Sequence, residues 1–335
     1  MSTIVQHFAV FQSFQTKSKM LLYTLLGGYV LTSIILFKYP TLLHKKKKIK
    51  FTCQHISHRG GAGESYENTM HAFKRAVTIG TQMLELDCHL TKDGEVVVSH
   101  DENLLRSTGI NENISDLCFK DLPLLKTHLP IDFDPDKEYI GSQKEEDRRF
   151  ALLRDVFEAF PNVPVNIDIK INNDKLISEV SNLIKKHNRE EYTVWGNFND
   201  DVTQKCYKVN PNVNLLFSLR RVALLLLFMY TGLLPFIPIK ETHLEIFLPS
   251  VYLRHQASTC RPMQRFIERA ICVLLIRPCL FNHLKARGIH IYFWVLNKDE
   301  EFKEAFDLGA TGVMTDYPTR LKLFLRNYSP EYYNK

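Results

Sequence analysis

Three short groups of residues in the first third of the chain carry side chains that can bind ions and move protons. The groups are His58-Arg59, Glu85-Leu86-Asp87 and His100-Asp101. Each group follows or lies within a short apolar run of the kind that forms a β-strand. Glu85 and Asp87 are two positions apart, so they share one face of their strand.

Two carboxylates on one strand face repel each other unless they have a partner. A divalent cation between Glu85 and Asp87 would remove that repulsion, and all-oxygen ligands suit Mg²⁺ or Ca²⁺. For this strand on its own, the alternative is a half-exposed sheet with a solvated polar face.

A later run, residues 165–170, repeats the alternation. Its apolar side chains face one way, whereas Asn166, Asp168 and Lys170 face the other. With the first three groups, this run brings acids, histidines, an arginine and a lysine to successive strand ends. A (β/α) barrel builds its active site in this way, and we therefore expect these side chains to converge.

The same residues carry a family resemblance. The stretches that carry it are residues 58–61, 67–69, 84–101 and 309–318. In these stretches the chain resembles the glycerophosphodiester phosphodiesterase family, over roughly residues 54–325. The resemblance implies an α/β fold, a TIM (β/α)8 barrel, and a phosphoric diester hydrolase. The hydrophobic N-terminal segment makes the chain most similar to the membrane-anchored branch that acts as a lysophospholipase D.

The resemblance also implies a ligand set for one divalent cation, Mg²⁺ or Ca²⁺. Glu85, Asp87 and Asp168 stand at the family's three metal-ligand positions. The family more often has glutamate at the third position, so Asp168 is a shorter substitute. The identity of the ion stays open, because site size and rigidity decide between the two cations.

The remaining polar residues suit the hydrolysis of a phosphodiester. We expect His58 and His100 to be the acid–base pair, one accepting a proton from the attacking oxygen and the other protonating the leaving alcohol. Which does which stays open, as does whether water or the substrate's own hydroxyl attacks. Arg59 and the cation would polarise a phosphoryl oxygen, and Lys170 would add a point charge. Trp294 is expected to line the substrate pocket, with a core position as the alternative.

The elements that position these residues are strands alternating with helices up to the C-terminus, which predicts parallel strands. Further strands are expected at about residues 192–195, 215–219, 289–296 and 312–315. Helices are expected at about residues 67–80, 152–160, 176–184 and 299–309. The predicted barrel covers residues 54–325, with insertions at about 102–150, over the barrel mouth, and about 222–281.

The N-terminal region predicts a membrane anchor. Residues 20–37 form an almost uncharged apolar run of about one membrane thickness. A flexible tail, residues 1–19, precedes it, a basic linker, residues 38–53, follows it, and residues 326–335 form a second tail. The alternative is a cleaved signal peptide, but no small-residue cleavage site is present and the stronger basic flank follows the apolar core. The lysines place the barrel in the cytosol, with the endoplasmic reticulum as the default membrane.

Residues 222–239 form a second long apolar segment that hydropathy alone would assign as a span. A single crossing there would separate the last two strands from the barrel, and Gly232, Pro235 and Pro238 interrupt a straight helix. We expect this segment to dip into the bilayer or to line a groove for an acyl chain, with residues 262–281 sharing that surface. The alternative is a buried helix of the barrel wall.

Composition sets the remaining limits. The chain has 335 residues, of which 45% are hydrophobic, with a net charge of +6 and seven cysteines. The cysteine spacing argues against a disulfide scaffold or a zinc site. We expect a lysophospholipid substrate and a membrane partner, but no nucleic acid and no obligate protein partner.

Three hypotheses about function follow. The first is a lysophospholipase D that releases lysophosphatidic acid and a free headgroup alcohol. The second is a phosphodiesterase of soluble, deacylated diesters that releases glycerol 3-phosphate. The third is a non-catalytic membrane scaffold, which would have lost an acid or a histidine that this chain retains.

Overall fold

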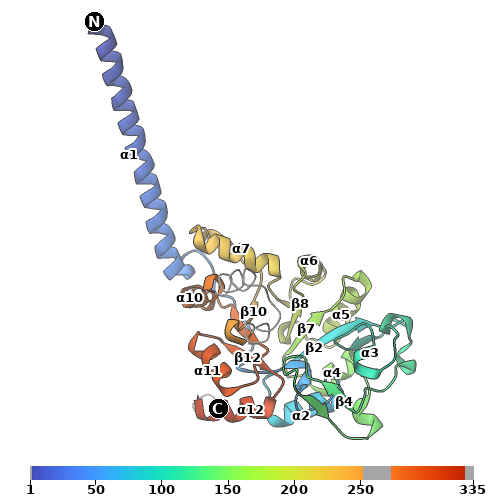
Figure 1. The fold of residues 1–335 in the computed structure, drawn as a ribbon. Helices are drawn as coiled ribbons and strands as arrows, with labels where there is room; N and C mark the ends of the chain where they lie inside the picture. Colours follow the sequence, from blue (N-terminus) through green and yellow to red (C-terminus); the bar gives the residue numbers. More distant parts are fainter. Residues whose placement is uncertain (1, 252–272, 329–335) are drawn as a thin grey trace.

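The structure is a computed structural model that describes residues 2–251 and 273–328 of the chain. Most of the segment 262–281, which the sequence assigned to an apolar surface, therefore lies outside the described residues. Figure 1 shows a barrel surrounded by helices, with one long N-terminal helix that projects away from it.

Eight parallel strands form the barrel. In spatial order they are β10 (His243–Phe247), β11 (His290–Trp294), β12 (Gly312–Thr315), β1 (His55–Ser57), β2 (Met83–Leu90), β7 (Val165–Ile169), β8 (Thr193–Gly196) and β9 (Asn214–Leu215). A parallel bridge between Leu216 and His243 joins the two ends of this order. The predicted (β/α)8 barrel is thus confirmed.

Strand alternation separates the two surfaces of the barrel. Leu84, Leu86 and Cys88 of β2 face outward and pack in one core cluster with side chains of the surrounding helices. The inward side chains form the barrel floor, where Met83, Leu216 and other apolar residues lie in a second cluster. The polar faces predicted for β2 and β7 therefore point into the barrel rather than toward bulk solvent.

Helices surround the strands. They are α2 (Met70–Ile79), α4 (Leu153–Ala159), α5 (Asp174–Lys186), α6 (Asp200–Val209), α7 (Leu219–Tyr230), α10 (Pro278–Ala286), α11 (Asp299–Asp307) and α12 (Pro318–Tyr328). Local signals explain their ends. In α2, the Thr69 side chain accepts a hydrogen bond from the Ala72 amide, and Gly80 ends the helix with φ +103°.

The first insertion is built from short elements. They are α3 (Leu105–Thr108), the hairpin of β4 (His128–Pro130) and β5 (Glu138–Ile140), and the 3-10 turns η3 (Ile114–Asp116), η4 (Phe119–Asp121) and η5 (Glu145–Arg148). The remaining short elements are η1 (Pro40–Leu42), η2 (His58–Gly60), β6 (Ala151–Leu152), η6 (Glu190–Tyr192) and η7 (Leu234–Phe236).

Two strand predictions need correction. The run that ends before His100 forms β3 (Val96–Val98), which pairs antiparallel with β2 and is not a barrel strand. The remaining barrel strand is β10, which was not predicted. It lies inside the predicted insertion 222–281 and divides that segment. The sequence did not reveal β10 because two of its five side chains, His243 and Glu245, are polar and lie inside the barrel.

The N-terminal helix α1 (Ser2–Lys38) is longer than predicted. It includes residues 2–19 of the segment that was expected to be a flexible tail, and this segment contains no glycine or proline to stop a helix. Within it, Gln15–Lys38 is long and apolar enough to cross a membrane by length and composition, and only 6% of its most apolar window is buried.

Helix α1 is joined to the barrel by polar contacts. Tyr29 Oη donates to the Thr231 carbonyl (2.6 Å), and Ser33 Oγ donates to the Gly232 carbonyl (2.6 Å). In the predicted basic linker, the Lys47 amide donates to the Arg287 carbonyl (2.9 Å). The base of α1 and the start of the linker are therefore fixed to the loop after α7 and to the end of α10.

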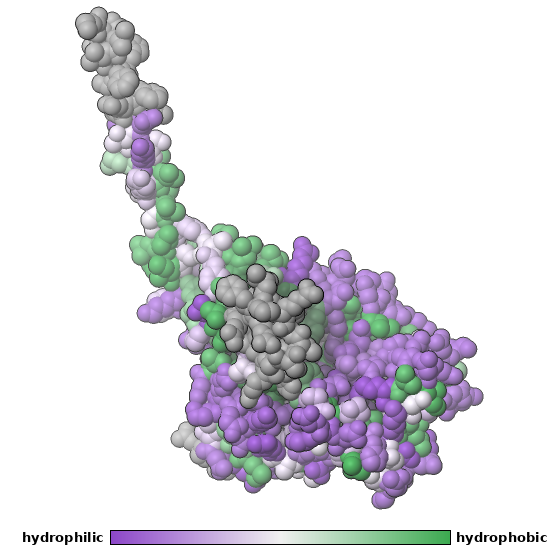
Figure 2. Space-filling view, in the orientation of Figure 1, coloured by the Kyte–Doolittle hydropathy of each residue, from purple (hydrophilic) through white to green (hydrophobic). Residues whose placement is uncertain are grey.

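Helix α7 is neither a span nor a fully buried wall helix. Its 12 residues extend about 18 Å, which is short of a bilayer core. Leu225 is buried against the barrel, whereas Leu227 is 55% exposed and Tyr230 is 50% exposed. In Figure 2 the hydrophobic surface of the lower half of α1 continues toward α7.

Candidate active site

One cavity of about 270 Å³ lies at the carboxyl ends of the barrel strands. Its lining includes all eight residues singled out from the sequence. They are His58, Arg59, Glu85, Asp87, His100, Asp168, Lys170 and Trp294. The predicted convergence of these side chains is therefore present in the folded chain.

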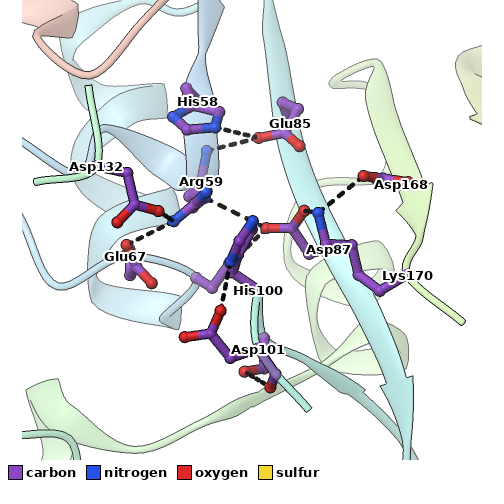
Figure 3. Close-up of polar contacts among 12 residues, drawn as sticks. His58, Arg59, Glu67, Glu85, Asp87, His100, Asp101, Asp132, Asp168 and Lys170 are labelled. Atoms are coloured by element: carbon purple, nitrogen blue, oxygen red, sulfur yellow. Dashed lines mark hydrogen bonds and ion pairs between the residues drawn. The ribbon is translucent and has the colours of Figure 1, made fainter. Parts of the chain in front are cut away.

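The register of two neighbouring strands brings the acids together. In the pairing of β2 with β7, Asp87 is the direct partner of Asp168. Lys170 Nζ donates to Asp168 Oδ2 (2.9 Å) and lies 3.2 Å from Asp87 Oδ1 (Figure 3). Burial acts to raise the pKa of Asp87, but the charges of Lys170 and Arg59 outweigh it and lower that pKa.

Glu85 has the opposite electrostatic environment. Burial and repulsion from Asp87 raise the pKa of Glu85 well above its ordinary value. The Arg59 amide donates to Glu85 Oε2 (2.8 Å), and the nearest ionisable nitrogen among the described ion pairs is His58 Nε2, 3.9 Å away. Glu85 is thus a buried carboxylate that a bound cation would stabilise.

Arg59 occupies a strained turn after β1. Its φ is +50°, and Gly60 and Gly61 follow with φ +78° and +100°. A Cβ on Gly61 would lie 2.6 Å from the ring of Pro318, so a larger residue does not fit there. This turn directs the guanidinium of Arg59 toward the carboxylates, where its Nη1 donates to Glu67 (3.0 Å) and to an aspartate of the insertion.

Both candidate histidines bind an aspartate through the same nitrogen. His58 Nδ1 donates to Asp316 Oδ1 (2.7 Å), and His100 Nδ1 donates to Asp101 Oδ1 (2.7 Å). Asn297 Nδ2 donates to the other oxygen of Asp316 (3.0 Å). An Nδ1–H held in this way leaves Nε2 of each imidazole as the atom that can accept or donate a proton.

β3 explains how His100 reaches the cavity. β2 extends beyond the residues that pair with β7, and β3 returns antiparallel along this extension. The Ser99 amide donates to the Asp87 carbonyl (3.0 Å), which sets the next residue, His100, beside the acids. The histidine therefore lies at the barrel mouth although its strand is outside the barrel.

The candidate ligands have the donor chemistry of a divalent-cation site but not its spacing. Glu85, Asp87 and Asp168 supply carboxylate oxygens, the donors that hard cations prefer, and the charge of Glu85 is poorly compensated. In the described part of the chain, however, no three His, Cys, Asp or Glu side chains are grouped closely enough to hold an ion. Lys170 instead bridges Asp87 and Asp168, so the chemistry of the donors fits a cation while their spacing would have to tighten around it.

The sequence analysis missed several residues of the site. From the first insertion, Asp132 Oδ2 accepts from Arg59 Nη1 (2.8 Å), and the Phe133 ring packs edge-on against His58 and against Trp294. The insertion therefore contributes side chains to the site, although nothing periodic in it indicated these two residues. Asp316 lies in the closing stretch 309–318, where the family pattern could have singled it out.

Comparison with known proteins gives one consistent result. The model of the glycerophosphoryl diester phosphodiesterase family matches residues 58–320. The chain is 57% identical to lysophospholipase D GDPD1 of Homo sapiens over 91% of this chain and 96% of that protein. It is 41% identical to lysophospholipase D GDPD3 of Homo sapiens over 91% and 95% of the two chains.

Solved structures agree at the level of the fold. A phosphodiesterase of Oleispira antarctica, in complex with the product sn-glycerol-3-phosphate, superposes with a TM-score of 0.58 at 18% identity, over 82% of this chain and 97% of that one. A putative glycerophosphoryl diester phosphodiesterase of Silicibacter pomeroyi gives a TM-score of 0.61 at 16% identity, over 86% and 97%.

Proposed function

The chain belongs to the glycerophosphoryl diester phosphodiesterase family, and from this we propose that it is a metal-dependent lysophospholipase D. It hydrolyses lysoglycerophospholipids to lysophosphatidic acid and the free headgroup alcohol. The observation that carries the proposal is one cavity in which two aspartate-bound histidines, an arginine, a lysine and the three candidate ligand acids meet.

The reaction exchanges one P–O bond for another. The oxygen of water attacks phosphorus, and the bond from phosphorus to the headgroup oxygen breaks. Of His58 and His100, one Nε2 accepts the proton of the attacking oxygen and the other protonates the departing alcohol. Arg59 and Lys170 offset the negative charge that grows on the phosphoryl oxygens.

Glu85, Asp87 and Asp168 would hold the divalent cation. When bound, the cation supplies Lewis-acid polarisation of the phosphoryl group. A cation held by Asp87 and Asp168 would compete with Lys170 for the same oxygens, so we expect the ammonium group to be released toward the substrate. Whether the ion is Mg²⁺ or Ca²⁺ is left to the experiment below.

The lipid substrate is supported by the path from the cavity to the anchor helix. Phe217 lines the cavity, and α7 begins two residues later at Leu219. The helix ends at Tyr230, and the next carbonyl, that of Thr231, accepts the hydrogen bond from Tyr29 of α1. The exposed apolar side chains of α7 thus extend from the cavity toward the anchor, where an acyl chain can follow them.

We place α1 across a membrane as an uncleaved anchor. The lysines at residues 45–48 put the barrel on the cytosolic side, and the endoplasmic reticulum is the proposed membrane. Because its base is bonded to the loop after α7, the anchor holds α7 near the headgroup layer rather than letting the barrel swing freely.

The test uses the purified full chain in detergent micelles. Lysophosphatidylcholine and glycerophosphocholine are supplied side by side, with Mg²⁺, with Ca²⁺, or with a chelator. The expected result is choline release from the lysolipid, dependent on one of the ions, and little turnover of the soluble diester. Release of glycerol 3-phosphate from the soluble diester alone would replace the proposal with the second hypothesis. Full activity in the presence of chelator would show that the reaction does not depend on a cation.

A further inference from the structure

Glu245 is a cavity acid for which the proposed reaction has no role. It lies on β10, four places from β2 in the eight-strand order and therefore on the opposite side of the barrel from Glu85. Asn166 Nδ2 donates to Glu245 Oε1 (2.6 Å) across the interior. Glu245 is partly accessible, and because it lies inside the barrel, that accessible part faces the cavity.

The charge of Glu245 is not balanced by the residues that the structure describes. Asp87 and Asp168 share Lys170, and Asp132 pairs with Arg59. Among the residues that the structure describes, no lysine, arginine or histidine forms an ion pair with Glu245. An acid deep in a barrel without a cation is costly unless it is protonated or a ligand brings the opposite charge. Burial, with repulsion from Asp168, raises the pKa of Glu245 to about 8.

Aromatic rings line the same part of the cavity. Trp294 is one inward position above the β11 residue that pairs with Glu245, and Phe198 lies against its ring with centroids 5.4 Å apart. Phe217 lies on the wall between β9 and α7. Rings of this kind attract a cation through their electron-rich faces, and quaternary ammonium groups are ligands that use this attraction.

We propose that Glu245 and the rings of Phe198, Phe217 and Trp294 form a headgroup subsite that selects a positively charged amino alcohol, as in choline or ethanolamine esters. The inference rests on the proposed function and deepens it by naming the class of headgroup. A buried carboxylate is a poor neighbour for an acyl chain, whereas it complements an ammonium group. The part of the cavity beside Glu245 then takes the headgroup, and the acyl chain leaves along α7.

The test compares two lysolipids that differ in headgroup charge. The full chain is assayed on lysophosphatidylcholine and on lysophosphatidylglycerol in the same micelles. Glu245→Gln keeps the side-chain shape and an oxygen for Asn166 Nδ2 but removes the charge. We expect kcat/KM for the choline lipid to fall by about tenfold or more relative to the glycerol lipid. An equal loss on both lipids overturns the subsite and leaves the proposed hydrolysis standing.

A binding measurement tests the headgroup subsite independently of the proposed hydrolysis. Choline chloride and tetramethylammonium are titrated into wild-type protein and the variant by calorimetry. We expect binding to the wild type and binding weakened by about tenfold or more in Glu245→Gln. Equal affinity, or no binding to the wild type, overturns the subsite. Choline binding by a protein that hydrolyses neither lipid overturns the proposed function instead.

Two further variants control these experiments. Glu300→Gln makes the same chemical change at an exposed position on α11, so both lipids should be turned over as by the wild type. Phe198→Leu removes one ring from the rim, where the side chain is 47% exposed, so the fold tolerates the change. Phe198→Leu should lower the ratio of kcat/KM on the choline lipid to kcat/KM on the glycerol lipid while Glu245 stays in place. Unchanged preference in this variant overturns the aromatic part of the subsite.

Discussion

Two histidine–aspartate pairs lie at the cavity, and the proposed proton transfers rest on them. Each imidazole presents Nε2 because Nδ1 is bound to a carboxylate, His58 to Asp316 and His100 to Asp101. One pair is assembled from opposite ends of the domain and the other from neighbouring residues. Both aspartates have a second partner, since Asn297 Nδ2 donates to Asp316 and Arg106 Nε donates to Asp101 Oδ2. Asp316 is the more buried of the two.

His100→Ala should lower kcat by about 10²- to 10⁴-fold, the usual contribution of a general acid or base. Membrane attachment should be unchanged, because His100 is remote in sequence from α1 and contacts acids of the barrel mouth. The measurement is choline release together with flotation of the protein on vesicles. His128→Ala is the matched control, because His128 is exposed on β4 and does not line the cavity, so its activity should equal that of the wild type. Normal turnover in His100→Ala would contradict the assignment of His100 as an acid or base.

Asp316→Asn should lower kcat by about 10²-fold while changing KM little. The amide can no longer hold the Nδ1–H tautomer of His58, yet it keeps the shape of the side chain. Steady-state kinetics on the lysolipid checks this expectation, and a melting curve checks the fold. A loss confined to KM would show that Asp316 positions substrate rather than His58.

Most of the site could be predicted at this scale because its residues lie in strongly alternating strands. Glu85, Asp87 and Asp168 each have apolar neighbours on both sides, which fixes the face they occupy. Asp132 and Phe133 could not be predicted, because they come from an insertion without periodicity. Glu245 was missed together with its strand, whose inward residues are polar.

At the scale of elements, α7 lies between the cavity residue Phe217 and the loop that is bonded to α1. Leu227 and Tyr230 face outward, while Leu225 packs inward, so the helix has one face on the barrel and one left uncovered by the described residues. The sequence revealed the apolar character of 222–239 but not its division into α7, η7 and the approach to β10. The prolines and the polar inward residues of β10 set the bounds of these elements. That His243 and Glu245 face the barrel interior can be seen only in the folded chain.

Leu227→Asp should weaken turnover of vesicle-bound lysolipid by about fivefold or more and leave a soluble diester analogue unaffected. A charge on an apolar face that lies in the headgroup layer opposes insertion. Leu323→Asp on α12 is the matched control, since Leu323 is 54% exposed, and α12 lies at the end of the barrel away from α1 (Figure 1). Rates on vesicles of increasing lipid concentration supply the comparison. Equal behaviour of the two variants would mean that α7 does not meet the membrane.

At the scale of the whole molecule, two histidines, His243 and His290, are packed against each other at the end of the barrel opposite the cavity. His243 and His290 lie with ring centroids 5.0 Å apart, beside Phe51 and Tyr292. Burial lowers the pKa of His290 to about 4 and lowers that of His243 well below its ordinary value. The folded barrel therefore excludes protons that the unfolded chain accepts.

Acidification should consequently destabilise the protein. The unfolded chain protonates these histidines near pH 6.5 and the folded chain protonates His290 only near pH 4, so stability is lost as pH falls between those values. The loss from His290 alone is at most about 3 kcal/mol. Melting curves from about pH 7 down to about pH 5 should show a falling Tm, with a smaller slope in His290→Gln. A Tm that rises on acidification would contradict this account.

The junction between α1 and the barrel also has a kinetic consequence. Tyr29 and Ser33 bind the loop after α7, and Lys47 binds the end of α10. With α1 embedded as proposed, these contacts would keep the catalytic domain close to the plane of the membrane. An enzyme held in this way meets its substrate by lateral diffusion in two dimensions. Its rate should follow the mole fraction of lysolipid in the bilayer. Adding inert phospholipid to the bilayer would slow it, whereas adding buffer to the suspension would not.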